Sequence, residues 1–250
     1  MNTLINLGSS LQIPLGGIKL PDSPWVTIAL IGLAAIILVV SGIKNKAPLG
    51  IALVAALIFI AARLGLTGLA QMGFVLSDNL LKTALLGVSI GTVLSLLSII
   101  VIQPLIEAIT KQPHDVTIVE GVQGSWKGLL SWLVLNWTFV AFGEEILFRG
   151  FLMSQLIKLL GTSFLALMFN VFLASIIFGL AHSYQGRSGI WSTGIIGVCL
   201  GVAYIMSGFN LWLPIVVHGV MNSVELILMS RGADKGLREL IWKKPLQPAG

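Results

Sequence analysis

The chain has 250 residues, of which 56% are hydrophobic and only 10% are charged. Soluble domains carry about 25% charged residues, so this composition excludes an ordinary soluble protein and predicts one that meets lipid. The net charge of +5 does not indicate nucleic-acid binding, because the basic residues are scattered singly between hydrophobic runs, apart from the tail from Arg231 to Lys244. We interpret these charges as anchors at the headgroups of the lipid bilayer and expect a cytoplasmic C-terminal end.

Several hydrophobic runs are candidates for membrane-spanning helices. In chain order they extend from Trp25 to Ile43, Leu49 to Leu66, Ala84 to Ile102, Gly128 to Phe142, Phe164 to Ala181, Ile190 to Ser207 and Leu211 to Met229. Pro104 is expected to close the third run, since proline cannot continue a helical hydrogen-bond ladder. We therefore expect residues 1–250 to form a single membrane domain with an all-α fold, a polytopic bundle of transmembrane helices.

The segment from Glu144 to Leu160 decides the number of spans. It has apolar residues at helical spacing but also carries several charged residues. If it continues the preceding helix, the chain has seven spans and its termini lie on opposite sides of the membrane. If it crosses separately, the chain has eight spans and both termini lie on one side.

Most of the polar residues at membrane depth follow Lys127, in the region from 128 to 229. They are Glu144, Glu145, Arg149, His182, His218 and Asn222. Ionisable groups inside a membrane are costly, so they are candidates for function by default. This region is therefore the predicted catalytic core.

The spacing of these residues assigns them to groups. Glu145 and Arg149 lie four apart on one helix face, where a carboxylate and a guanidinium can pair. This pairing leaves Glu144 without a dedicated cation, as the candidate general base. The same spacing of four places Phe178 beside His182 and His218 beside Asn222.

These side chains suit the hydrolysis of a peptide bond. A carboxylate and a histidine can hold a water molecule and make it nucleophilic, while a second histidine and an asparagine amide can donate hydrogen bonds to an oxyanion. Glu144 and His182 would share a membrane side most simply if the chain between them crossed the bilayer once more. We therefore predict about eight crossings, with seven as the alternative.

Three blocks of sequence closely resemble the CPBP family of CAAX proteases and bacteriocin-processing enzymes. They are E-E-x-x-x-R from Glu144 to Arg149, F-x-x-x-H from Phe178 to His182 and H-x-x-x-N from His218 to Asn222. The resemblance covers roughly Gly128 to Met229.

This resemblance implies an intramembrane endopeptidase whose substrate is a protein or peptide at the membrane, either prenylated or bearing a leader. It implies that Glu144 and His182 activate water, and that His218 and Asn222 stabilise the oxyanion. By the same resemblance, Glu145 and Arg149 support the site and Phe178 packs beside it.

The metal requirement is open at this stage, because members of the family have been described both as metalloproteases and as glutamate-dependent proteases. Two histidines and a glutamate are an acceptable set of zinc ligands. The sequence lacks H-E-x-x-H, however, and Asn222 suits an oxyanion donor better than a ligand. We expect no required cofactor, with zinc as the alternative.

Two further function classes remain in view. In the first, the polar cluster only stabilises the bundle, and the chain is a non-catalytic membrane partner such as an immunity or assembly factor. In the second, the buried acids and histidines line a transport or proton pathway. A transporter would be expected to show inverted repeats or interrupted helices, and neither is clear in the sequence. The sequence carries no signal for an oligomeric state.

Overall fold

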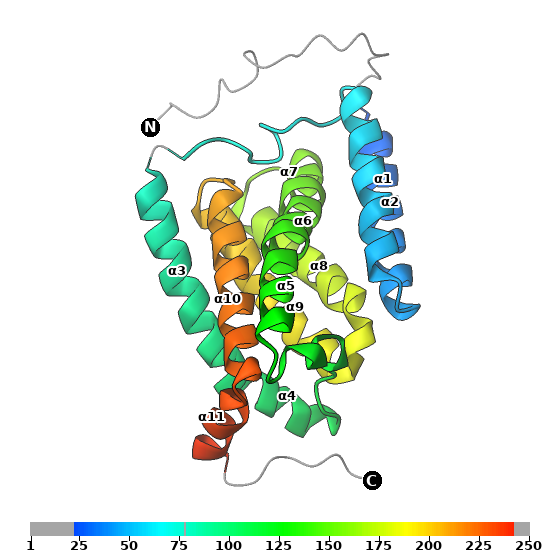
Figure 1. Ribbon diagram of the computed structural model, residues 1–250. Helices are drawn as coiled ribbons and strands as arrows, with labels where there is room; N and C mark the ends of the chain where they lie inside the picture. The colour runs from blue at the N-terminus through cyan, green and yellow to red at the C-terminus, as the bar shows by residue number, and fades with distance from the viewer. Residues whose placement is uncertain (1–22, 78, 243–250) are drawn as a thin grey trace.

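The protein is an α-helical bundle in the computed structural model, which describes residues 23–77 and 79–242. No strand occurs in these two ranges, which confirms the predicted all-α fold. Figure 1 shows the long helices side by side along one axis, with α11 and α4 at one end and the connection from α2 to α3 at the other. The buried catalytic candidates lie between these helices.

The structure defines the helices as follows. The α-helices are α1 (Pro24–Ile43), α2 (Ala47–Arg63), α3 (Leu80–Leu97), α4 (Gln103–Thr110), α5 (Trp126–Leu135), α6 (Ala141–Glu145), α7 (Ser154–Leu160), α8 (Phe164–Ala181), α9 (Gly186–Met206), α10 (Trp212–Ser230) and α11 (Ala233–Ile241). The π-helical segments are η1 (Ser98–Ile102), η3 (Asn136–Val140) and η4 (Ile146–Met153), and the 3-10 segments are η2 (Thr117–Val122) and η5 (Ser183–Gln185).

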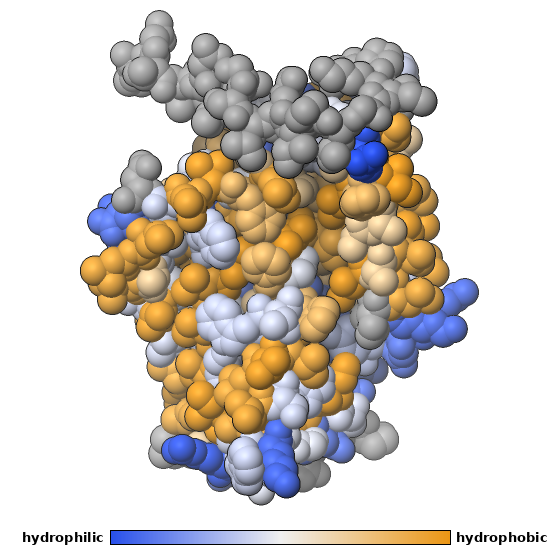
Figure 2. Space-filling view, turned by 45° about the horizontal axis from the view of Figure 1, so that its top comes forward, coloured by the Kyte–Doolittle hydropathy of each residue, from blue (hydrophilic) through white to orange (hydrophobic). Residues whose placement is uncertain are grey.

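The surface of the bundle has the character of a protein embedded in lipid. Five helical stretches are long and apolar enough to cross a membrane: Pro24–Ile43, Leu80–Thr110, Phe164–Ala181, Ser183–Met206 and Trp212–Ser230. The helix Leu49–Arg63 is apolar but shorter. Large hydrophobic side chains are exposed along these helices, and hydrophobic residues cover much of the face seen in Figure 2. The chain is therefore an integral multi-pass membrane protein.

Side chains cap three of these helices at their N-termini. Asn79 accepts a hydrogen bond from the backbone N–H of Lys82 at the start of α3, at 2.8 Å. Ser125 and Ser163 begin α5 and α8 in the same way. Such caps satisfy backbone donors that have no partner within the helix, so they fix where each helix begins.

The third predicted span does not end at Pro104. The helix runs from Leu80 to Thr110, and Pro104 is the second residue of α4, directly after the π-helical segment η1. The wider π turn accommodates the proline ring and its missing N–H without breaking the helix. The prediction that Pro104 closes the span was therefore wrong.

The prediction of eight crossings was also wrong. Residues 126–160 form one uninterrupted helical run through α5, η3, α6, η4 and α7, so the segment from Glu144 to Leu160 continues the preceding helix. At 1.5 Å per residue this run is about 50 Å long. In the described part of the chain there are seven long helical passes: α1, α2, α3 with α4, the run from α5 to α7, α8, α9 and α10.

The acids explain this error. Glu144 and Glu145 lower the local hydropathy and made the span appear to end at Phe142, although both side chains are buried inside the bundle. Glu144 therefore lies near the middle of the long run. After the turn at Gly161, α8 packs against η4 and α7 and brings His182 back to the level of Glu144.

Within the described residues, the buried hydrophobic side chains form a larger and a smaller cluster. The larger one joins α1, α2, η4 and α8, and includes Leu38, Val54, Phe151 and Phe178. The smaller one joins α3, α9 and α10. Because α8 contacts both the hairpin of α1 and α2 and helix α9, the candidate residues at its C-terminal end are held from several directions.

Candidate active site

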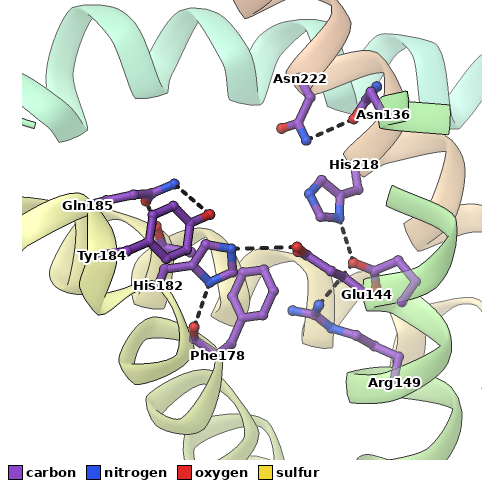
Figure 3. A network of polar contacts seen from close by, with 11 residues as sticks. Asn136, Glu144, Arg149, Phe178, His182, Tyr184, Gln185, His218 and Asn222 are labelled. Carbon is purple, nitrogen blue, oxygen red and sulfur yellow. Dashed lines mark hydrogen bonds and ion pairs between the residues drawn. The ribbon is translucent and has the colours of Figure 1, made fainter. Parts of the chain in front are cut away.

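The structure brings the three sequence blocks together. They contribute Glu144 and Glu145 of α6, Arg149 of η4, Phe178 of α8, His182 at the C-terminal end of α8, and His218 and Asn222 of α10. In Figure 3 the labelled side chains from these elements surround one space. All but Asn222 are buried. Residues up to 78 positions apart in the blocks therefore form a single polar cluster inside an apolar bundle.

Glu144 and His182 face each other across a short gap. Nε2 of His182 lies 3.6 Å from Oε1 of Glu144, which is longer than a direct hydrogen bond. Nδ1 of His182 lies 2.8 Å from the carbonyl oxygen of Phe178. A carbonyl can only accept, so Nδ1 carries a hydrogen, and in the neutral ring Nε2 presents its lone pair toward Glu144.

A small cavity adjoins this pair. It has a volume of about 20 Å³ and is lined by Leu38, Ser41, Ile51, Glu144, Phe148, Ala181, His182 and Tyr184. About 10–15 Å³ suffices for one water molecule when polar partners are present. Oε2 of Glu144 is buried and has no hydrogen-bond partner within the described ranges. The cavity therefore has room for one water molecule beside Glu144 and His182.

Glu145 links the first block to the third. Its Oε1 lies 2.9 Å from Nη1 of Arg149 and 2.8 Å from Nδ1 of His218. Nη2 of Arg149 donates to the carbonyl oxygen of Gly197 on α9 at 2.8 Å. The predicted pair of Glu145 and Arg149 is thus present, and the contact with His218 adds a function that spacing alone could not show. Glu145 fixes the orientation of the His218 ring.

Phe178 packs at the centre of the cluster. Its ring lies 4.6 Å from the ring of His182 and 4.8 Å from the guanidinium of Arg149. It also meets the ring of Phe148 edge to face, at 4.8 Å between centroids. The guanidinium over the ring face is a cation–π arrangement. Phe178 therefore packs against both His182 and Arg149, and its ring also meets the ring of His218 edge to face at 6.3 Å between centroids.

Asn222 is held by a residue that the sequence reasoning missed. Nδ2 of Asn222 donates to Oδ1 of Asn136 at 2.9 Å, and Nδ2 of Asn136 donates to the carbonyl oxygen of Gly219 at 2.9 Å and to Oγ of Ser223 at 3.3 Å. The available signal was an amide side chain within an apolar run, which is costly unless it is paired. Asn136 sets the orientation of the Asn222 amide.

Two π-helical segments flank the acids. The segments η3 and η4 lie directly before and after α6, which ends in Glu144 and Glu145. Wide turns of this kind appear frequently at functional sites, because they redirect side chains within a helix. Here they place Asn136, Glu144, Glu145 and Arg149 of one helical run toward α8 and α10.

Glu144, His182 and His218 are the candidate zinc ligands of the site. Among the residues that the structure describes, no group of three or more His, Cys, Asp or Glu side chains is placed to hold a metal ion. A catalytic zinc takes three protein ligands and one open position. Glu144 and His182 could supply two of them. His218 is bound to Glu145 through Nδ1, which leaves its Nε2 free, and zinc-ligating histidines commonly bind a carboxylate in this way.

Comparison with known proteins gives a family match that spans the residues of the site. Residues 126–224 match the family model described as type II CAAX prenyl endopeptidase Rce1-like. This range contains all three blocks, and the match confirms the resemblance to the CPBP family. It supports a CAAX-type intramembrane protease in general, with a protein or peptide substrate at the membrane. Comparisons with curated proteins and with solved structures give no match.

Proposed function

We propose that the protein is an intramembrane endopeptidase that hydrolyses a peptide bond of a membrane-associated protein with a water molecule activated by Glu144 and His182. The observation that carries this proposal is the gap of 3.6 Å between the two side chains, next to a cavity large enough for one water molecule. The family match over residues 126–224 independently supports peptidase chemistry.

The two groups are matched to a bound water. A carboxylate accepts hydrogen bonds, and Nε2 of neutral His182 also accepts, because Nδ1 donates to Phe178. A water molecule in the adjoining cavity, beside the pair, donates one hydrogen to each and directs its lone pairs away from them. As this water attacks the carbonyl carbon, Glu144 or His182 takes its proton, so the carboxylate–imidazole pair is the general base.

The tetrahedral intermediate needs donors for its negative oxygen. Nε2 of His218 is the ring atom opposite the contact with Glu145, and in the protonated ring it donates. One N–H of the Asn222 amide is bound to Asn136 and the second is available. We propose that these two donors form the oxyanion hole.

The charges within the cluster fit this division of roles. Glu144 and Glu145 contribute two negative charges and Arg149 one positive charge. One protonated histidine makes the buried cluster neutral, and an uncompensated buried charge would be costly. When the peptide C–N bond breaks, the proton taken from water moves to the leaving amine, and the cluster returns to its initial state.

We propose a mechanism that needs no metal ion, on the basis of the donor arrangement around Glu144 and His182. Metal content of the purified protein and its activity after treatment with a chelator test this point. Full activity of a preparation that contains far less than one zinc ion per protein chain supports the proposal. Loss of activity on chelation, with recovery on adding zinc, contradicts it.

We also propose that the C-terminal end of the described chain faces the cytoplasm. Figure 1 places the turn between α1 and α2, the connection from α4 to α5, the junction of α8 and α9 and helix α11 at one end of the bundle. These segments carry Lys44, Lys46, Lys111, Lys127, Arg187, Arg231, Lys235 and Arg238, whereas the segments at the opposite end carry Arg63, Lys82 and Lys158. Cytoplasmic segments carry the excess of basic residues.

The test of the proposed function is cleavage by purified protein in lipid vesicles. Glu144→Ala, His182→Ala and His218→Ala are compared with wild type on a fluorogenic peptide that carries a membrane anchor, and thermal unfolding confirms that each variant is folded. We expect each folded variant to lose at least about a hundredfold in rate, since each removes an acid–base group or a charged donor. Retained cleavage in all three contradicts the proposed site.

A further inference from the structure

Tyr184 reaches the same space without being part of any sequence block. It lies in η5, two residues after His182, and it lines the cavity beside Glu144. The rings of Tyr184 and His182 lie 5.6 Å apart, inclined at 36°. Figure 3 shows the hydroxyl of Tyr184 directed into the space between His182 on one side and His218 with Asn222 on the other.

Hydrogen bonding leaves this hydroxyl with a free hydrogen. Nε2 of Gln185 donates to Oη of Tyr184 at 3.3 Å, and an amide nitrogen cannot accept, so Oη is the acceptor. Within the described ranges the hydroxyl has no acceptor of its own at hydrogen-bond distance. Tyr184 is therefore a donor without a partner at the edge of the water cavity.

Neighbouring residues hold the side-chain amide of Gln185, and this amide sets the direction of the Tyr184 hydroxyl. Oε1 of Gln185 accepts a hydrogen bond from Oγ1 of Thr193 at 3.1 Å. Gly189 makes room for the Gln185 side chain, because a Cβ at this position would lie 2.2 Å from Cβ of Gln185. Thr193 and Gly189 both lie on α9, so the first two turns of α9 orient Gln185, and Gln185 orients the hydroxyl of Tyr184.

We propose that Tyr184 is a further catalytic residue, whose hydroxyl donates a hydrogen bond to the carbonyl oxygen of the scissile bond as that oxygen becomes negative. The proposal rests on the proposed function. Gln185 is a positioning residue, since it acts only through Tyr184. A neutral hydroxyl suits this place, because it adds a donor without adding a charge to a cluster that one protonated histidine already makes neutral.

Two substitutions test the proposal by different routes. Tyr184→Phe keeps the ring and removes the hydroxyl. Gln185→Glu keeps the size of the side chain but replaces the donor with a carboxylate, which accepts the hydrogen of Tyr184 and withdraws it from the cavity. Tyr204→Phe is the matched control, because Tyr204 is buried on α9 against Phe209 and does not line the cavity.

The readout is kcat and KM for the anchored peptide in vesicles. Tyr184→Phe is expected to lower kcat by about a hundredfold with KM nearly unchanged, since it removes a donor that acts on the transition state. Gln185→Glu is expected to lower kcat in the same direction, and the double variant Tyr184→Phe with Gln185→Glu to be no slower than Tyr184→Phe alone. The Tyr204→Phe control should cleave at the wild-type rate.

Inhibitor binding provides a second readout. A peptide aldehyde, which mimics the tetrahedral intermediate as its hydrate, should bind Tyr184→Phe more weakly, while the matching peptide alcohol should bind both proteins equally. An unchanged kcat in Tyr184→Phe, or an increase of KM alone, overturns the proposal while wild-type cleavage and its dependence on Glu144 still support the proposed function. A wild-type protein that cleaves no anchored peptide contradicts the proposed function itself.

Discussion

Oε1 of Glu145 lies 2.8 Å from Nδ1 of His218, and the same oxygen accepts a hydrogen bond from Arg149 at 2.9 Å. The second acid of the E-E pair therefore connects the helical run from α5 to α7 with α10. It neutralises Arg149 and orients a histidine at once. This shared oxygen explains why the two adjacent glutamates have different functions, although the sequence presents them as a pair.

Breaking the buried pair should destabilise the protein. Arg149→Met leaves Glu145 with a charge that only His218 can compensate, and removal of one partner of a buried ion pair costs about 3–5 kcal/mol. The double variant Glu145→Gln with Arg149→Met should be more stable than Arg149→Met, because it removes both charges. Thermal unfolding in detergent measures this order. An Arg149→Met variant that is as stable as wild type would contradict this expectation.

Asn136→Ala should lower the rate of cleavage. It removes the acceptor that holds the Asn222 amide and the donor to Gly219 on α10. A misplaced oxyanion donor is expected to cost up to about 10²-fold in kcat. Thr138→Ala is the control, because Thr138 lies in the same π-helical segment but is exposed and bonds only to the backbone of its own helix. Equal kcat for the two variants would exclude a role for Asn136.

Gly42→Val should reduce the rate of cleavage, because it displaces α1, which forms part of the cavity wall. A Cβ at Gly42 would lie 2.2 Å from the carbonyl oxygen of Ala181, the residue before His182, so any side chain must push α1 away from the end of α8. A displacement of about 1 Å near catalytic groups can cost 10²-fold in rate. Gly32→Val on the same helix is the control, since nothing lies within 4 Å of its Cβ position. Loss of activity in both variants would indicate general destabilisation of α1 instead.

Stability should fall as the medium becomes acidic. His114, in the connection between α4 and η2, contacts Oγ of Ser192 and lies near Arg238. Burial lowers the pKa of His114 from 6.5 to about 4; the positive charge of Arg238 adds to this effect, and the negative charge of Asp115 opposes it. The unfolded chain therefore binds a proton that the folded chain does not bind until a lower pH.

This difference defines a pH window. The stabilisation is complete above pH 6.5 and is lost as the pH falls from 6.5 toward 4. His114→Gln removes this group and should flatten the fall of the unfolding temperature between pH 7 and pH 5. A steeper or unchanged slope in His114→Gln would contradict the lowered pKa of His114.

The sequence predicted which side chains meet at the site better than it predicted the topology. The spacing of four in each block placed Glu145 beside Arg149, and the expectation that Glu144 and His182 meet agrees with the gap of 3.6 Å. The predicted number of crossings was wrong, because charged residues lower the local hydropathy and so indicate the end of a span. Glu144 and Glu145 are instead compensated by Arg149, His182 and His218 within the bundle.

Residues that act through one other side chain were the hardest to predict. Asn136 lies 86 positions from Asn222, and no helical periodicity relates two residues at that distance. In the run from Trp126 to Leu160, the π-helical segments η3 and η4 turn side chains away from the faces that ideal α-helical spacing predicts. Tyr184 lies two residues after His182 of the second block. Only the position of the Gln185 amide shows that the hydroxyl hydrogen of Tyr184 is free.

Glu144→Gln tests the central claim most directly. The substitution preserves the size of the side chain and removes the charge that makes the carboxylate a base, and thermal unfolding confirms that the variant is folded. With the anchored fluorogenic peptide in vesicles, Glu144→Gln should cleave at least about 10²- to 10⁴-fold more slowly than wild type, the range expected for a general base. Cleavage by Glu144→Gln at the wild-type rate would contradict the account.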